Sequence, residues 1–368
     1  MLPLNTATRI GLSILLLLAG VVALHLGASV FMPMFVALLL ATVLGPAAVS
    51  LHETFKIRWG VACMTVVATL VLINLLLVAI FSANATVMVT KMSDEKQILE
   101  IYNWKLRPKL EKVWPVELDP DVFPKNAKDI RSIGALRYFI DAAPDYFRKT
   151  ARVTADWSWQ VILTLFITFF VLLEGKMLAK RVVAIFGPTP EIQGKATEVL
   201  FEMAKQVRNY LVWRTLINLG LAIVMGILYQ MFGLTQAWNW AVLLAVLNYV
   251  PYLGPLLAIV PPFLDAFIFV DPAAAIVLTV LYIVVIVLEG YLVVPLVMGR
   301  SMDLNATTVM LGCLFWELVW GMTGLFLAMP IMAGLKAILF HVPEWRPWAN
   351  LMSAEEHPLE NPPAPPAG

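Results

Sequence analysis

The sequence predicts an all-α integral membrane protein, a bundle of about eight transmembrane helices with one long polar loop and a cytoplasmic amphipathic helix. Of its 368 residues, 60% are apolar and 14% charged, and the mean hydropathy is +0.82. Soluble domains contain roughly 45–50% apolar and about 25% charged residues. The apolar residues are also grouped into stretches of about 20, the length that crosses the hydrocarbon core as a helix. The formal net charge of +1 argues against a basic protein that binds nucleic acid.

Eight apolar stretches have a length suited to a membrane span. They are approximately Ile10–Leu26, Phe31–Leu51, Gly60–Ala83, Trp157–Leu173, Leu216–Phe232, Trp238–Pro262, Ala273–Val297 and Thr307–Phe340. A continuous helix over the last stretch would reach roughly 50 Å, against a hydrocarbon core of about 30 Å. We therefore expect this span to tilt or to break, with Gly321, Gly324 and Pro330 as the break points.

These spans divide the chain into six segments. We expect the first three transmembrane helices in residues 1–90, an external amphipathic helical segment in 91–155, the fourth span in 156–175, a cytoplasmic helical segment in 176–213, spans five to eight in 214–340, and a disordered proline-rich tail in 341–368. Arg and Lys residues in short loops favour the cytoplasm. With the N-terminus inside, the short external loops contain only Arg300, so both termini are expected in the cytoplasm.

The two polar segments contain amphipathic patterns. In Lys91–Arg152, apolar residues recur at helical spacing on both sides of the proline-containing run Trp114–Pro124. These helices either lie on the membrane surface, where they could cap a pore, or form a hairpin that packs against the bundle. In the second segment, Thr189 is suited to a helix N-cap and Pro190 to the first helical position. The helix that follows either packs on the protein's own cytoplasmic face, which we favour, or serves coupling or oligomerisation.

No motif in the sequence predicts catalysis, a cofactor or a metal site. Gly175-Lys176 and Gly194-Lys195 lack the Ser or Thr that completes a Walker A loop, and His52-Glu53 is followed by Lys56 where a zinc motif needs a second His. Both cysteines lie in apolar stretches without metal-ligand spacing. We therefore expect a protein that is not an enzyme.

A cluster of helix-breaking residues interrupts the sixth stretch. Two prolines and a glycine within five residues remove backbone donors and should unwind a helix inside the membrane. The freed carbonyl groups must then be satisfied by protein, by ions or by a wet cavity, and broken helices form the binding sites of many secondary transporters. The alternative is a proline kink that only shapes packing. The candidate pathway residues here are Asn248, Tyr249, Pro251, Tyr252, Gly254 and Pro255.

Acidic residues inside apolar spans are the second candidate feature. Glu289 lies within the seventh stretch, and Glu317 lies in the eighth at a less certain depth. A buried carboxylate needs a partner, an aqueous path or a bound proton, so Glu289 could carry a proton or bind a cation. The alternative is a structural hydrogen bond to a neighbouring helix. Gly290 and Pro295 follow at spacings that permit bending or close helix approach.

At these motifs the sequence resembles the autoinducer-2 exporter family of permeases. The resemblance rests on the runs Pro251–Pro255, Leu288–Gly290 with Pro295, and Gly321–Pro330, and it extends from about Ile10 to Phe340. It implies a bacterial inner-membrane transporter of about eight spans, often oligomeric. Some members resemble exporters of the small signal autoinducer-2. Others resemble antiporters that exchange sodium or lithium ions for protons. The bulky run Trp316–Trp320 departs from the small residues usual in the family.

The leading hypothesis is a secondary transporter that exports a small polar molecule such as autoinducer-2, with proton coupling through Glu289. Asn248, Tyr249, Tyr252 and Tyr291 could supply its polar contacts. The alternatives are a sodium or lithium/proton antiporter, a passive channel and a non-transporting membrane scaffold. The expected partners are membrane lipids, a small polar solute, protons or sodium ions, and further copies of the chain, but no nucleic acid.

Overall fold

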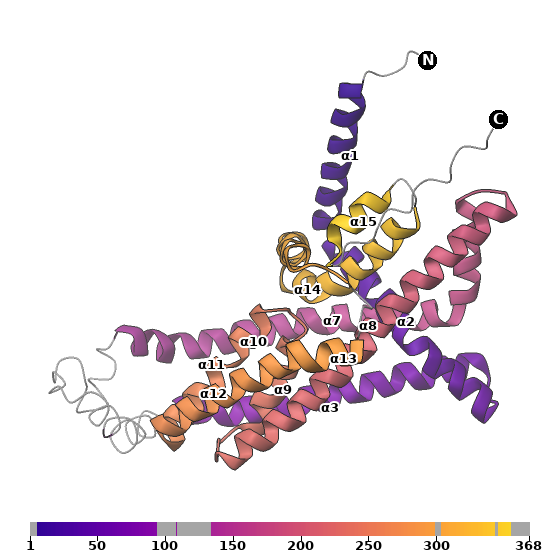
Figure 1. Cartoon of the computed structure of the whole chain (residues 1–368). Coiled ribbons are helices and arrows are strands. Elements are labelled where there is room, and N and C mark those ends of the chain that lie inside the picture. The colour runs from indigo at the N-terminus through magenta and orange to yellow at the C-terminus, as the bar shows by residue number, and fades with distance from the viewer. Residues whose placement is uncertain (1–5, 94–107, 109–133, 299–302, 343–344, 355–368) are drawn as a thin grey trace. The chain divides into compact units, whose positions relative to one another are not determined.

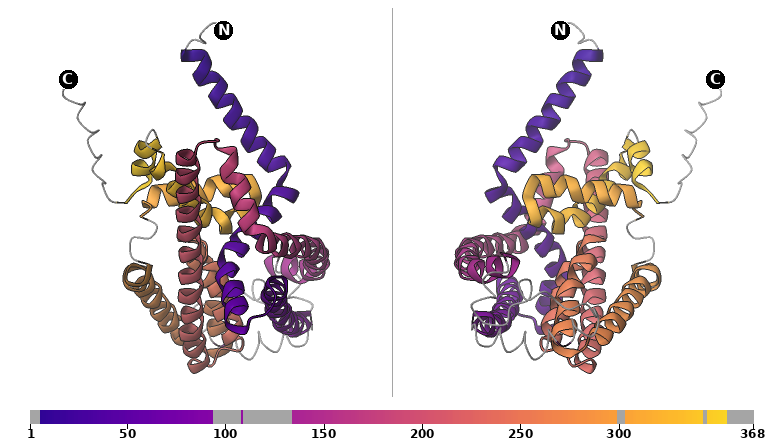
Figure 2. Two further views of the ribbon diagram at one scale, coloured as in Figure 1. Left: turned by 90° about the vertical axis from the view of Figure 1, so that its right-hand side faces the viewer. Right: turned by 90° about the vertical axis from the view of Figure 1, so that its left-hand side faces the viewer.

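The computed structural model describes residues 6–93, 108, 134–298, 303–342 and 345–354. Within these ranges the regular elements are helices, as Figure 1 and Figure 2 show, together with an isolated antiparallel bridge between Leu304 and Ser353. The all-α fold class predicted from the composition and the apolar stretches is confirmed.

In chain order the elements are α1 (Thr6–Leu26), α2 (Ala28–Phe55), α3 (Trp59–Ser93), α7 (Gly134–Ile185), α8 (Pro190–Met231), α9 (Ala237–Leu247), α10 (Leu253–Ala258), α11 (Val260–Asp265), the π-helix η2 (Ala266–Val270), α12 (Pro272–Leu288), the π-helix η3 (Glu289–Val293), α13 (Val294–Met298), α14 (Ala306–His341) and α15 (Arg346–Met352).

Six helical runs among the described residues are long and apolar enough to cross a bilayer. They are Ala28–Phe55, Trp59–Leu76, Trp159–Ile185, Pro190–Met231, Pro272–Met298 and Ala306–His341. Shorter apolar helices cover Gly11–Leu26, Ala237–Leu247 and Leu253–Asp265. The predicted sixth span, Trp238–Pro262, is thus divided among short helices instead of forming one rod.

The fourth predicted span lies inside a much longer helix. α7 contains 52 residues and continues through both predicted segment boundaries, at 155/156 and 175/176. Charged residues flank its apolar centre but do not end it, because Lys, Arg and Glu are good helix formers. The proline-containing run Trp114–Pro124 and most of the helical pattern predicted before it lie outside the described residues. α8 begins at Pro190, the residue predicted for the first helical position.

Part of the segment predicted to be a disordered tail is ordered. α15 lies within residues 341–368, and its Ala349 is fully buried. The side chain of Asn305 donates to the carbonyl oxygens of Leu351 and Ser353 at 2.7 and 3.2 Å. These bonds satisfy carbonyl groups at the C-terminal end of α15 that have no partner within the helix. The proline-rich residues 355–368 lie outside the described ranges.

The first compact unit comprises Met1–Cys63, Phe166–Thr215 and Val294–Gly368. In this unit α14 is kinked at Trp320 and Gly321, whose backbone dihedral angles are not helical. The φ of Gly321 is +61°, a conformation that side chains other than glycine rarely adopt. The indole nitrogen of Trp320 donates to the Leu24 carbonyl of α1 at 3.0 Å.

An ion pair fixes the start of α14 in the same unit. Lys336 Nζ lies 2.9 Å from Asp303 Oδ2, and both side chains are nearly buried. Asp303 Oδ1 also accepts from the backbone N–H of Ala354, just beyond α15. The pair therefore connects the interior of α14 with the segments before and after it.

The second compact unit comprises Met64–Leu165 and Leu216–Val293. Its core is built from α8, α9, α10, α12 and their connections, and alanines alternate in it with large side chains such as Met225, Tyr229 and Leu244. Small residues let helix backbones approach closely in the absence of a hydrophobic driving force from lipid.

A buried carboxylate holds the start of α9 in the second unit. Asp265 is 5% exposed and ends α11. Its oxygens accept from Thr235 Oγ1 at 2.8 Å, from the Gln236 backbone N–H at 3.2 Å and from Trp240 Nε1 at 2.8 Å. These donors surround the first turn of α9, where free N–H groups and the helix dipole favour a negative charge.

We expect Asp265→Asn to destabilise the protein more than Asp271→Asn. Each hydrogen bond to a charged group contributes about 1.5–3 kcal/mol, and Asp265 accepts several inside a packed core. Asp271 is exposed and caps α12 through one bond to Ala273 N–H at 2.9 Å, an N-cap that contributes about 1 kcal/mol. Thermal unfolding of the purified protein, followed by size-exclusion fluorescence, measures the difference. Equal decreases in melting temperature would show that Asp265 acts only as a local cap.

Candidate functional site

The helix break in the second unit is a tight, hydrogen-bonded loop. α9 ends at Leu247 and α10 begins at Leu253. Tyr252 has φ +62° and ψ −53°, an uncommon conformation for a residue with a side chain. The Leu253 N–H donates to the Pro251 carbonyl at 2.6 Å, and the Gly254 N–H donates to the Val250 carbonyl at 3.1 Å. The backbone therefore satisfies part of its own polar groups at the break, as a membrane interior requires.

Glycine is needed at position 254 because two backbone segments approach each other there. A β-carbon on Gly254 would lie 1.9 Å from the Leu247 carbonyl oxygen, at the end of α9. Because Gly254 has no side chain, the start of α10 can lie close to the end of α9. The φ of Gly254 itself is in the ordinary range.

Three polar side chains meet beside this break. Asn248 follows α9 directly, Asn218 lies on α8 and Glu289 begins η3, and their exposed fractions are 1%, 2% and 7%. Asn248 Nδ2 donates to Asn218 Oδ1 at 3.0 Å and to Glu289 Oε1 at 3.4 Å. Asn218 Nδ2 in turn donates to the Ala245 carbonyl of α9 at 3.0 Å. The cluster therefore joins three elements through side-chain amides.

The π-helical turn changes the direction of the chain at Glu289. Glu289 is buried, whereas its neighbours Leu288 and Gly290 are exposed. π-turns inside α-helices occur frequently at functional sites. The run Pro272–Met298 stays helical throughout, so neither Gly290, inside η3, nor Pro295, inside α13, interrupts it.

Two tyrosines extend the polar cluster within the same core. Tyr282 Oη donates to the Pro255 carbonyl of α10 at 2.6 Å. Tyr282 is close enough to both Glu289 and Tyr229 for electrostatic interaction. Tyr229 is fully buried, and its hydroxyl has no hydrogen-bond partner among the described residues. We call the set Asn218, Asn248, Glu289, Tyr282 and Tyr229 the polar row.

The sequence predictions located part of this row. Asn248 and Glu289 were predicted and lie in contact, whereas Tyr229 and Tyr282 were missed. A usable signal existed for Tyr282, which precedes Glu289 by seven residues and so lies on the same face of a helix.

Several candidate pathway residues lie outside the polar row. Tyr249 is half-buried, and the side chains of Tyr252 and Tyr291 are 59% and 84% exposed. Glu317 is exposed on α14 and belongs to the first unit. Glu317 is not buried among other polar groups, so it lacks the feature that makes Glu289 distinctive.

The three break points predicted in the last span, Gly321, Gly324 and Pro330, have different structural roles. The chain leaves the helical conformation at Gly321. At Gly324 a β-carbon would lie 1.9 Å from the Trp316 carbonyl oxygen, so this glycine permits the close return of the chain after the kink. Pro330 is buried within α14, and the helix continues past it.

The polar row can bind a small polar molecule or a proton. Amide and hydroxyl groups donate and accept hydrogen bonds, while a carboxylate adds a site that can be charged or protonated. In an apolar core such groups are costly unless they are satisfied. The row therefore provides a polar environment inside a unit whose other buried residues are mainly apolar.

Comparison with known proteins identifies the family. The sequence model of the AI-2E family transporters matches residues 12–344. The chain belongs to this family. The AI-2E family resemblance inferred from the sequence motifs is thereby confirmed, and so is membership in a family of membrane transporters.

Three relatives illustrate the breadth of the AI-2E family. The Escherichia coli K12 protein named "Putative transport protein YhhT" is 26% identical over 337 residues, covering 89% of this chain and 90% of the relative. The "AI-2 transport protein TqsA" of the same organism is 23% identical over 341 residues, with 89% and 92% covered. The Bacillus subtilis "Putative transport protein YrrI" is 26% identical over 176 residues, about half of each chain.

We expect Gly254→Ala to lower the stability of this AI-2E family member strongly. The added methyl group overlaps the Leu247 carbonyl, so the backbone must shift at a packed junction, and overpacking costs typically about 1–3 kcal/mol. Gly220→Ala on α8 is the matched control, because a β-carbon there meets nothing within 4 Å and alanine favours a helix. The melting temperatures of the two purified variants provide the measurement. A Gly254→Ala protein as stable as Gly220→Ala would contradict the close approach.

Proposed function

We propose that this protein is a secondary transporter that moves a small polar molecule, of the autoinducer-2 type, out of the cell across the bacterial inner membrane. The observation that carries the proposal is the polar row, buried beside a broken helix in the second unit. The printed name of the relative TqsA supports the substrate class. The distribution of Arg and Lys supports cytoplasmic termini.

Glu289 is the proposed site of proton coupling. Its carboxylate is nearly buried and accepts from the side-chain amide of Asn248 at 3.4 Å. A carboxylate with adjustable side-chain partners can exist in charged and protonated forms at modest cost, and interior carboxylates form the proton relays of many transporters. Burial favours Glu289 over Glu317 for this role.

Cation/proton antiport is the second candidate function. It is favoured by the oxygens that the row contains, since Glu289 and the two asparagine side chains supply carboxylate and amide oxygens, the ligands that hard cations prefer. The two functions differ in whether sodium or lithium alone discharges a proton gradient.

Glu289→Gln tests the proposed coupling. In proteoliposomes with an imposed proton gradient, we expect this variant to lower the initial rate of autoinducer-2 transport at least tenfold, because glutamine keeps the shape and cannot exchange a proton. Glu198→Gln, which removes an exposed carboxylate on α8, should keep the rate within a factor of two of the wild type.

An unchanged rate in Glu289→Gln would make Glu289 a structural residue. Release of protons by added sodium or lithium, without any dependence on autoinducer-2, would instead assign the protein to cation/proton antiport. The same vesicles measure both outcomes.

Tyr229→Phe should separate function from stability. The buried Tyr229 hydroxyl costs free energy because it lacks a hydrogen bond within the described core, and such a group costs about 1–3 kcal/mol. Its removal is expected to raise the melting temperature and to lower the transport rate, if the hydroxyl serves the transported molecule or a proton. Tyr282→Phe should instead lower the melting temperature, because it removes the bond to Pro255. A more stable Tyr229→Phe protein with normal transport would exclude Tyr229 from the pathway.

A further inference from the structure

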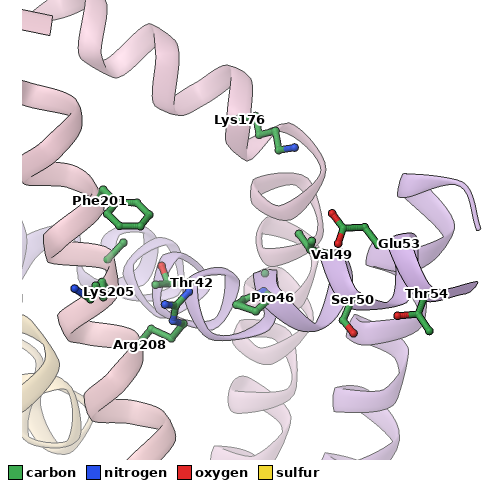
Figure 3. A pocket seen from close by; sticks show the side chains of 12 residues that line it. Thr42, Pro46, Val49, Ser50, Glu53, Thr54, Lys176, Phe201, Lys205 and Arg208 are labelled. Atoms are coloured by element: carbon green, nitrogen blue, oxygen red, sulfur yellow. The ribbon is translucent and has the colours of Figure 1, made fainter. Parts of the chain in front are cut away.

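A cavity of about 700 Å³ lies between α2, α7 and α8 in the first unit (Figure 3). It belongs to a different unit from the polar row and shares no residue with it. Its lining includes the apolar side chains Pro46, Val49 and Phe201 and the basic side chains Lys176, Lys205 and Arg208.

The basic side chains give the cavity a positive character. The lining contains three basic side chains and one carboxylate, that of Glu53. Lys205 also lies 3.4 Å from Glu202, so part of its charge is compensated. Within the described residues, Lys176 and Arg208 form no ion pair. The guanidinium of Arg208 offers planar paired donors that match phosphate oxygens.

The cavity lies where the helices change from apolar to polar sequence. On the C-terminal side of its apolar centre α7 becomes basic from Lys176 onward, and α8 contains no charged residue after Arg214. α2 ends with polar residues from Ser50 onward. Basic residues at such a boundary lie at the depth of lipid headgroups, and basic pockets between transmembrane helices bind anionic headgroups.

We propose that this cavity binds an anionic phospholipid, with its headgroup among the basic side chains, which include Lys176 and Arg208, and the start of an acyl chain against Pro46, Val49 and Phe201. A free phosphate ion would use the basic residues but leave the apolar lining residues in contact with water. A molecule with both a phosphate group and an apolar chain matches both kinds of lining residue. The site is independent of the proposed transport pathway.

Native mass spectrometry of the full-length protein in non-ionic detergent tests the proposal. The probes are dioleoyl phosphatidylglycerol, dioleoyl phosphatidylcholine and inorganic phosphate. We expect preferential binding of phosphatidylglycerol and an affinity at least tenfold lower in the double variant Lys176→Gln/Arg208→Gln. The matched control is Lys180→Gln/Lys195→Gln, which removes one exposed basic residue from each of the same two helices and should retain the affinity within a factor of two.

A second variant fills the cavity without altering its charge. A β-carbon on Gly45 meets nothing within 4 Å, so Gly45→Leu can extend into the space from α2. It should weaken phosphatidylglycerol binding at least fivefold and leave the melting temperature of the lipid-free protein unchanged or higher. This variant keeps the proposal testable if the double variant does not fold.

Three results would overturn the proposal. Equal losses in the cavity and control double variants would indicate nonspecific attraction to basic charge. Equal affinity for phosphatidylcholine would remove the role of the anionic headgroup. Displacement of phosphatidylglycerol by inorganic phosphate at the same concentration would assign the site to the soluble anion.

Discussion

The buried amides and the carboxylate in the second unit are held by hydrogen bonds with one another, because an unsatisfied polar group in an apolar core is costly. This constraint explains why Glu289 does not stand alone. Its carboxylate meets Asn248, Asn248 meets Asn218, and Asn218 returns to the backbone of α9. The break after Leu247 places Asn248 at the end of a helix, where its side chain can reach both neighbours. Loss of one group would remove a hydrogen bond from its neighbour in this cluster.

The two buried acids of this unit show how differently a protein can hold a carboxylate. Asp265 accepts from a hydroxyl, an indole and a backbone N–H, all placed by the start of α9. These donors are fixed by the helix, so the charge stabilises one geometry. Glu289 faces a side-chain amide at a longer distance. Side-chain amides can rotate without unfolding a helix, and Glu289 is therefore better suited than Asp265 to a change of state during transport.

Local sequence signals predicted much of the fold and part of the site. Apolar length predicted the spans, and Pro251, Gly254 and Pro255 predicted a break, because proline and glycine act on the backbone nearest to them. The contacts of Asp265 with the start of α9 and of Asn305 with α15 were not predicted. They join residues about 30 and 46 positions apart, and no local pattern encodes which distant helix ends meet. Tyr229 was missed because an aromatic residue in an apolar span is usually part of the hydrophobic core.

The orientation of the Asn248 amide connects the protonation of Glu289 to the helix break. Asn248 presents its nitrogen to Glu289, which is favourable when the carboxylate is charged, because that group only accepts hydrogen bonds. A protonated Glu289 can donate instead, and it would then prefer the amide oxygen. Rotation of the amide would also change the contact with Asn218, and through it the link to α9 at Ala245. In the proposed proton-coupled cycle, a proton on Glu289 would thereby alter the hydrogen bonds beside the broken helix.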